Sequence, residues 1–294
     1  MKKYLIVILI SSFLASCGDD TVVSEIETDS TADSTAIDSN LSPERAGKAQ
    51  MIFQTIPSPF ETATIFEEAG AGYNQELTNS IDHVSNYTTS SQQALNLGVY
   101  GADLSYANIF DQSQESMFYM NCSKILADGL GVTAAFSPET IERIEENMNN
   151  RDSMMIIVND AFWTCDAYLK ENGQNDLSAL IIIGGWVEGL YLGSSSIDRN
   201  NPSEELMGKI ADQKFSLNNL LGLLETYDNE EVNKLRDQLN SLKVVFDKVE
   251  EGDGATTVSG DETPVIGGTS LKYNKETIFE IADQAKIIRN EIIK

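Results

Sequence analysis

The 294 residues include only one imidazole side chain, His83, and three thiol side chains. A zinc site takes several ligands from these two residue types, and no thiol stands near His83 to complete one. His83 follows Asp82, and a lone histidine of this kind is more often a surface or locally hydrogen-bonded residue than a general base. The sequence therefore predicts no metal centre and no cofactor.

Catalytic signatures are missing as well. The chain has no Gly-x-Ser-x-Gly elbow, no phosphate-binding loop and no dinucleotide-binding glycine pattern. Gly252-Asp253-Gly254, which follows Glu250 and Glu251, is loosely similar to a calcium loop. It lacks the alternating oxygen ligands of an EF-hand, so it predicts no calcium site.

Basic residues are scarce. The chain carries 20 Lys and Arg against 46 Asp and Glu, with a formal net charge of -26. From Arg45 onward there are 38 acids and 18 bases. Such a field repels nucleic-acid backbones and anionic lipid, so the sequence predicts no nucleic-acid binding. The commoner use of an acid excess is a solubilising surface.

Only six prolines are present, and four of them follow Ser or Asn where a helix would begin. Proline lacks the amide hydrogen that a first helical turn leaves unused, and the Ser or Asn side chain can cap the next amides. These dipeptides are Ser42-Pro43, Ser58-Pro59, Ser137-Pro138 and Asn201-Pro202. Ser58 and Glu61 have the spacing of a capping box.

Strand patterns are almost absent, and apolar residues recur at intervals of three and four along most of the chain. The fold class is therefore predicted to be all-α. Segment 73–91 reads as a loop or short helix, and the Gly-rich segment 251–274 reads as a long loop or a small hairpin. Helices are expected at 43–55, 59–69, 92–110, 114–130, 137–150, 152–172, 177–193, 202–225, 229–250 and 275–293.

The stretch 177–193 is the most apolar part of the chain after its N-terminal run. It is shorter than the roughly 20 residues that cross a bilayer, and Glu188 interrupts it, so we expect a buried central helix. Its glycines at 184, 185, 189 and 193 lower helix propensity. They are most useful where another backbone approaches closely.

An echo of this stretch lies earlier in the chain. Segment 97–104 aligns with segment 183–190, so that aliphatic, glycine, aromatic and leucine positions coincide. A duplicated multi-helix unit would explain the match, and chance recurrence of the same residue types would also explain it. The domain is thus expected to be a multi-helix bundle or a short stack of helical hairpins.

The first sixteen residues carry Lys2 and Lys3, an apolar run and then small polar residues, which is the order of an export signal. Leu14-Ala15-Ser16-Cys17 resembles the lipobox of bacterial lipoproteins. The resemblance implies cleavage before Cys17 and acylation of that cysteine, which would tether the mature chain to a membrane. The alternative is an ordinary signal peptide with a cysteine placed by chance.

Residues 17–41 are rich in Ser, Thr and Asp and are expected to form a disordered stalk. Gly18-Asp19-Asp20 is similar to the surface-export signals of Bacteroidota lipoproteins. Three triplets that begin with Asp resemble the O-glycosylation sites of that phylum, although the composition alone would also produce them. The acceptors would be Thr21, Ser30 and Ser34.

Two cysteines remain after the anchor, Cys122 and Cys165. An exported location permits a disulfide between them. Both lie in apolar helical context, and we favour buried free thiols.

Four acids stand inside apolar helical stretches: Asp103, Asp160, Asp166 and Glu188. Two of them brought together would raise a pKa or share a cation. The alternative is that each pairs with Lys124, Arg143, Arg151 or a tyrosine hydroxyl. Aromatic residues could line a groove, although at helical spacing they are more often core. The candidate ligand-binding residues are Tyr100, Asp103, Trp186 and Glu188.

The domain organisation follows from these segments: a signal peptide at 1–16, a stalk at 17–41 and one all-α domain at 42–294. We expect an outer-membrane lipoprotein, facing the periplasm or the cell surface, whose helical domain binds a peptide, protein or glycan partner. A carboxylate-based hydrolase or cation-dependent enzyme is one alternative. A purely structural envelope component is another.

Overall fold

A computed structural model of the chain describes residues 55–252 and 270–294. By its internal contacts the chain divides into two units, Met1–Ser34 and Thr35–Lys294, and all described residues belong to the second. The expected signal peptide, stalk and first helix, with Cys17, Thr21, Ser30 and Ser34, lie outside the described residues. So does the segment 253–269 of the Gly-rich loop.

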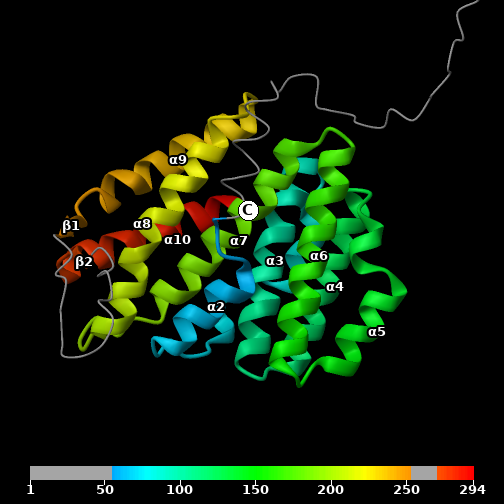
Figure 1. Cartoon of the computed structure of the whole chain (residues 1–294), viewed down its shortest axis with the longest axis horizontal. Coiled ribbons are helices and arrows are strands. Elements are labelled where there is room, and N and C mark those ends of the chain that lie inside the picture. The colour runs from blue at the N-terminus through cyan, green and yellow to red at the C-terminus, as the bar shows by residue number, and fades with distance from the viewer. Residues whose placement is uncertain (1–54, 253–269) are drawn as a thin grey trace, which may run out of the picture. The chain divides into compact units, whose positions relative to one another are not determined.

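The all-α prediction is confirmed, because the described residues are mostly helical (Figure 1). The helices begin and end within a few residues of the expected positions. Two short 3₁₀ helices, η1 (Gln75–Leu77) and η2 (Ile81–Asn86), occupy the segment expected to be a loop or short helix, and η3 (Thr133–Phe136) follows α4. The α-helices are α2 (Pro59–Glu68), α3 (Ser90–Ile109), α4 (Ser113–Gly129), α5 (Pro138–Asn147), α6 (Arg151–Glu171), α7 (Asn175–Ser195), α8 (Glu204–Leu224), α9 (Glu230–Phe246) and α10 (Lys275–Ile292).

Side-chain caps fix several helix starts. The predicted capping box of α2 is present: the Glu61 amide donates to Ser58 Oγ at 3.2 Å, and the Ser58 amide donates to Glu61 Oε2 at 2.7 Å. Ser137 caps α5 through a single hydrogen bond, which the Thr140 amide donates to Ser137 Oγ. α8 begins two residues later than expected, since Ser203 is its N-cap.

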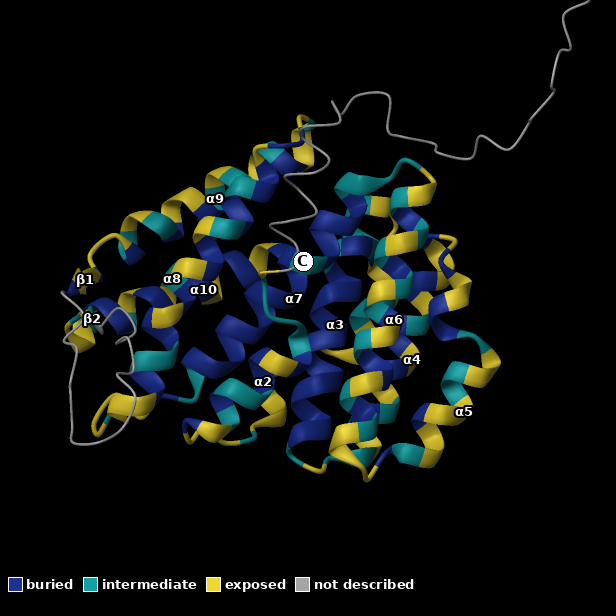
Figure 2. Ribbon diagram, viewed as in Figure 1, coloured by how far each residue is buried: buried dark blue, intermediate teal, exposed yellow. Residues whose placement is uncertain are grey.

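α7 is the centre around which the other helices pack. It contacts α2, α3, α6, α8 and α10, and it is buried along almost its whole length (Figure 2). Among the described residues it is the helix long and apolar enough to cross a membrane, but 94% of its most apolar window is buried inside the protein. A helix that is apolar on every side fits such a core position. The arrangement is a multi-helix bundle around α7.

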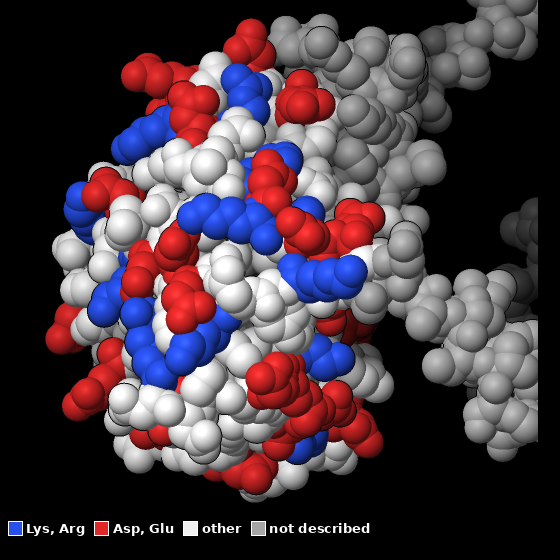
Figure 3. All heavy atoms as spheres, turned by 90° about the vertical axis from the view of Figure 1, so that its left-hand side faces the viewer, with Lys and Arg blue, Asp and Glu red and all other residues white. Residues whose placement is uncertain are grey.

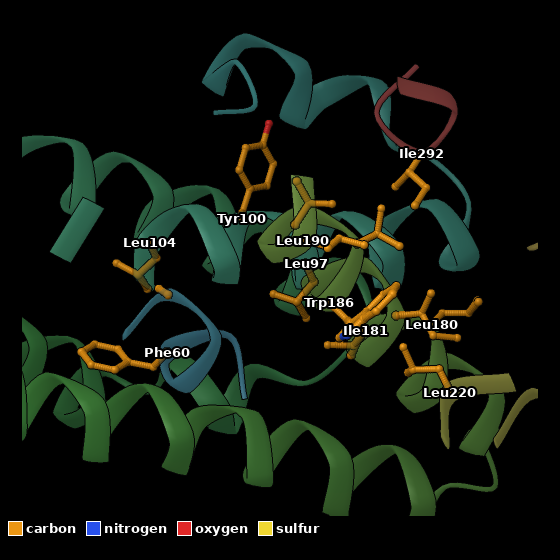
Figure 4. Close-up of a cluster of buried hydrophobic side chains, with 14 of the residues drawn as sticks. Phe60, Leu97, Tyr100, Leu104, Leu180, Ile181, Trp186, Leu190, Leu220 and Ile292 are labelled. Atoms are coloured by element: carbon orange, nitrogen blue, oxygen red, sulfur yellow. The ribbon is translucent and has the colours of Figure 1, made fainter. Parts of the chain in front are cut away.

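Glycines allow α3 and α7 to cross at backbone contact, which confirms the prediction for Gly184 and Gly185; Gly189 and Gly193 instead face the side chains of Thr62 and Phe66. A Cβ on Gly98 would overlap the Ile181 carbonyl oxygen, and a Cβ on Gly184 would overlap the Leu95 carbonyl oxygen. The two segments that echo each other in sequence are therefore packed against each other. Large apolar side chains from both helices, including Leu97, Tyr100, Ile181, Trp186 and Leu190, fill the surrounding core (Figure 4).

The last part of the chain packs its apolar stripes inward. Val232, Leu235, Leu239, Leu242 and Phe246 of α9 are all buried. α9 ends earlier than expected, because Glu250–Gly252 forms strand β1, which pairs antiparallel with β2 (Ser270–Lys272). The base of the Gly-rich segment therefore closes as the hairpin that was one of the two alternatives.

Candidate functional site

The four predicted ligand-binding side chains are buried. Tyr100, Asp103 and Glu188 are 0% exposed and Trp186 is 2% exposed. The Tyr100 hydroxyl donates to the Ser80 carbonyl at 2.7 Å, and Trp186 Nε1 donates to Gln213 Oε1 at 3.1 Å. Trp186 also forms part of the floor of a surface hollow described below. The other three contribute to the interior, where an external ligand does not reach them.

Asp103 and Glu188 meet inside the protein, together with Arg289 of α10. Arg289 Nε donates to Glu188 Oε2 at 2.9 Å, and an Arg289 terminal nitrogen donates to Glu188 Oε1 at 3.0 Å. The same terminal nitrogen donates to the Leu77 carbonyl at 3.0 Å. Asp103 Oδ2 accepts from the Asn79 amide at 3.1 Å. We call these three side chains the carboxyl–arginine cluster.

Burial governs the protonation of this cluster. Burial raises the pKa of Asp103 well above its usual value, and the nearby Glu188 carboxylate raises it further. Burial also raises the pKa of Glu188, although Arg289 and a hydrogen bond from Asp103 oppose that rise. For Arg289 burial alone would lower the pKa, but the Glu188 carboxylate raises it overall. A hydrogen bond between the two carboxyl groups requires a proton on one of them, and the raised pKa of Asp103 makes Asp103 the candidate donor.

Access limits what the cluster can do. The guanidinium spans both oxygens of Glu188 and lies 4.7 Å from the centre of the Tyr191 ring, so the carboxylate is enclosed by protein groups. A hydrolase needs its carboxyl groups within reach of substrate or water. The described residues around Asp103 and Glu188 provide no open position of that kind. The cluster connects α3, α7 and α10.

The other candidate acids form pairs near the surface. Asp160 pairs with Arg143 at 3.4 Å, as the alternative reading expected. Asp166 pairs with Lys170 at 2.8 Å and accepts from Ser178 at 2.5 Å. The other bases named as partners bind elsewhere: Lys124 pairs with Asp128, and Arg151 pairs with Glu67.

The remaining single residues have the favoured roles. His83 Nδ1 is 2.9 Å from Asn79 Oδ1, so the histidine is locally hydrogen-bonded. Cys122 and Cys165 are buried free thiols. Within residues 55–252 and 270–294, no group of three or more His, Cys, Asp or Glu side chains is placed to hold a metal ion.

The open part of the structure lies along α6. A hollow of about 610 Å³ lies between α6 and the η3–α5 segment. Its lining residues include Arg143, Asp160, Trp163, Tyr168 and Glu171. A second hollow of about 350 Å³ lies on the other side of α6, against the start of α2, with Trp163 shared between the two.

Large apolar side chains stand on the outer face of α6. Ile156 is 54% exposed and Trp163 is 51% exposed. Seven residues separate them, so they lie on one face of the helix. Met155 lines a third hollow, of about 450 Å³, beside the same helix. We call Ile156, Trp163 and the three hollows the α6 surface.

The sequence contains a pattern that could have predicted this surface, but we assigned only the buried stripe of the same helix. The stripe Met155, Val158, Phe162, Cys165 and Leu169 was predicted to be core, and its members are buried or half-buried. Ile156 and Trp163 are apolar residues outside that stripe. An apolar pair displaced from the buried face at a spacing of seven indicates a second, exposed apolar face.

Charge is mixed on the opposite part of the molecule. On the face formed by α8, α9, α10 and the hairpin, acidic and basic side chains alternate (Figure 3). Lys243 pairs there with Asp247 at 2.6 Å, and Arg199 pairs with Asp283. This face does not have the uniform sign that a charged binding patch needs.

Comparison with known proteins adds no relative: no family model, no curated protein and no solved structure matches this chain.

Proposed function

We propose that this protein is a lipid-anchored envelope protein whose helical domain binds a protein partner through the α6 surface. The lipobox-like sequence that ends at Cys17 supports the anchor and the outer-membrane location. The single observation that supports the binding role is the exposed Trp163, which stands between two hollows on a helix whose opposite face is core.

Exposed tryptophan beside concave surface is typical of a protein interface. Tryptophan is enriched among the few residues that dominate binding energy, where a partner encloses it and excludes water. Ile156 extends the apolar area along the helix, and Asp160, Arg143 and Glu171 supply a polar rim. An apolar centre with a polar rim is the usual anatomy of such a surface.

Charge favours a basic partner. Three acidic residues, Glu61, Asp160 and Glu171, line the hollows. One basic residue, Arg143, is among the lining residues, and it forms an ion pair with Asp160. The chain as a whole carries -26. Such a field steers cationic partners and slows anionic ones. The partner segment is therefore one with an aromatic or aliphatic anchor flanked by Lys or Arg.

Tryptophan fluorescence tests the proposal directly. The chain has two tryptophans, and Trp186 is buried, so a Trp186→Phe background isolates the emission of Trp163. The probes are synthetic peptides with a central leucine or tryptophan analogue flanked by lysines, the same peptides flanked by glutamates, and neutral oligosaccharides. We expect the lysine peptides to bind with a salt-dependent affinity and the glutamate peptides to bind at least tenfold more weakly.

A matched pair of variants locates the site. Trp163→Ala removes the reporting fluorophore, so binding to the variants is measured by titration calorimetry. Trp163→Ala is expected to weaken binding by about 30-fold, the size of an interface hot spot. Val244→Ala removes an exposed apolar side chain from α9, where Val244 is 66% exposed, and is expected to leave binding unchanged. Equal losses in both variants would contradict the assignment to α6. If only the oligosaccharides bound, the partner would be a glycan and not a protein. If Trp163→Ala and Ile156→Ala both left binding unchanged, the α6 surface would not be the binding site, and a purely structural role would be favoured.

A further inference from the structure

The carboxyl–arginine cluster brings together two acids and one base from three helices far apart in the sequence. Glu188 and Arg289 are 101 positions apart, and Asp103 comes from a third helix. All three are buried. Asp103 Oδ1 receives no hydrogen bond from an amide, hydroxyl or guanidinium among the described residues, and its hydrogen-bonding neighbour is the Glu188 carboxyl. Two carboxyl groups form a hydrogen bond only when one of them carries a proton.

Charge balance leads to the same protonation state. If both acids were ionised, the cluster would carry a net charge of -1 away from water, which is a costly arrangement. With one proton on the pair it is neutral. Arg289 carries only one positive charge, so it can balance only one of the two carboxylates, and three of its N–H donors bind Glu188 and the Leu77 carbonyl.

In the described part of the chain, the other titratable groups around the cluster are tyrosines and a thiol, which add no second cation. Tyr100 and Tyr106 face it from α3, Tyr119 and Cys122 from α4, Tyr191 from α7, and Tyr73 from the segment before η1. Burial raises the pKa of each of these groups, so they stay protonated at neutral pH. Tyr87 faces Glu188 and Arg289 after η2, and burial raises its pKa too. His83 contacts Asn79, whose amide binds Asp103.

The last turn of α10 depends on the same region. Asn96 Nδ2 donates to the Ile292 carbonyl at 3.1 Å, and the Tyr87 hydroxyl donates to the Ile293 carbonyl at 3.3 Å. With the Arg289 contacts to Glu188 and Leu77, these bonds fix the end of α10 to α3, α7 and the segment between η1 and α3. A change of charge inside the cluster therefore acts on the position of α10.

We propose that the carboxyl–arginine cluster is a proton-dependent latch: one proton held between Asp103 and Glu188 keeps α10 docked, and loss of that proton to solvent base loosens α10 locally. An acid with a raised folded-state pKa contributes stability that is present below its unfolded value of 3.8 and is lost progressively as pH rises toward the folded value. A rise in pH toward the folded-state pKa of Asp103 is thus the condition that opens the latch.

Asp103→Asn is the central variant, because it keeps the shape and the hydrogen bond to Glu188 and removes the titrating proton. Between the unfolded pKa of 3.8 and the folded pKa of Asp103, the unfolding equilibrium constant of the unaltered protein should rise about tenfold more per pH unit than that of Asp103→Asn. Hydrogen exchange of α10 amides in the unaltered protein should accelerate with pH beyond the rise seen in Asp103→Asn. Infrared spectra of the unaltered protein at neutral pH should contain the carbonyl band of a buried protonated carboxyl group, and Asp103→Asn should lack it.

Two further variants complete the test. Glu188→Gln leaves Asp103 as the one acid facing Arg289, so it should ionise there and the protonated band should disappear. Asp283→Asn changes an exposed acid on the same helix, and it should keep the band and the pH dependence of the unaltered protein. Absence of the band from the unaltered folded protein, or equal pH dependence of stability and of α10 exchange in the unaltered protein and Asp103→Asn, would overturn the proposal. The infrared result needs no variant to fold.

Discussion

Adding one methyl group at Gly98 should separate the two central helices. A Cβ at Gly98 would overlap the Ile181 carbonyl oxygen and would lie 2.6 Å from the Gly185 amide nitrogen. Ordinary contacts begin near 3.4 Å, so the amide nitrogen alone requires a displacement of about 0.8 Å. Both obstacles are backbone atoms, and therefore α3 and α7 must move as helices.

The cost follows from the contacts that such a movement weakens. A gap of 0.5–1 Å removes about a quarter to a half of a dispersion contact worth about 0.1–0.2 kcal/mol, and a buried leucine makes about 40–60 contacts. If about half of those made by Leu97 reach α7, this side chain alone loses about 1–2 kcal/mol. Neighbouring buried side chains lose contacts too. We expect Gly98→Ala to lower the free energy of unfolding by about 3 kcal/mol or more.

Urea denaturation followed by far-UV circular dichroism measures this difference. Gly208→Ala is the matched control, because Gly208 is also inside a helix and its Cβ would meet only the Tyr273 hydroxyl, at 3.3 Å. Both substitutions gain about 1 kcal/mol of helix propensity. Their difference therefore isolates the helix crossing. If Gly98→Ala were as stable as Gly208→Ala, the argument from backbone contact would be refuted.

Three other predictions concern the cluster, the thiols and the anchor. Arg289→Met should lower the free energy of unfolding by about 3–5 kcal/mol, because Glu188 would stay buried without a cation. Urea denaturation at neutral pH measures this free energy, and an unchanged value would refute a stabilising role for the Arg289–Glu188 ion pair. Burial raises the pKa of Cys122 to about 11 and that of Cys165 to about 12, so a chromogenic disulfide reagent at pH 8 should modify both thiols only after unfolding, whereas rapid modification of the folded protein would mean that they are accessible. Cells given radiolabelled palmitate should label the protein, and Cys17→Ala should abolish the label; equal labelling of both would remove Cys17 as the lipidation site.

Local signals were sufficient to predict the helices. Ser58, Ser137 and the apolar stripe of α9 depend on interactions within one or two turns, and all three appear as expected. The two misplaced boundaries have different causes. The start of α8 is set locally, by the Ser203 cap. α9 ends at Phe246, ahead of Glu250–Gly252, which pairs with Ser270–Lys272 far along the chain, and no periodicity within the helix can indicate that pairing.

The buried acids were predicted as special positions, but their partners were not. Asp103 and Glu188 stand in apolar helical stretches, and both are buried. Asp160 stands in a similar stretch and is exposed, so the pattern by itself does not decide burial. Arg289 lies in an amphipathic helix among exposed charges, and the sequence around it resembles any solvent-facing turn. Its selection as the cation of Glu188 results from how α10 packs on α7, which depends on the whole bundle.

The same reasoning separates the interior from the candidate binding surface. A polar residue on an apolar helix face predicts a buried polar site. In this protein that site is the carboxyl–arginine cluster, which is enclosed and connects helices. An apolar residue on a polar face is the converse departure, and Trp163 and Ile156 of α6 are of that kind. A buried polar side chain of the first kind is tolerated only when another group in the chain forms hydrogen bonds with it. An exposed apolar side chain of the second kind is accessible to a partner from outside, and for this reason we propose that binding takes place on α6.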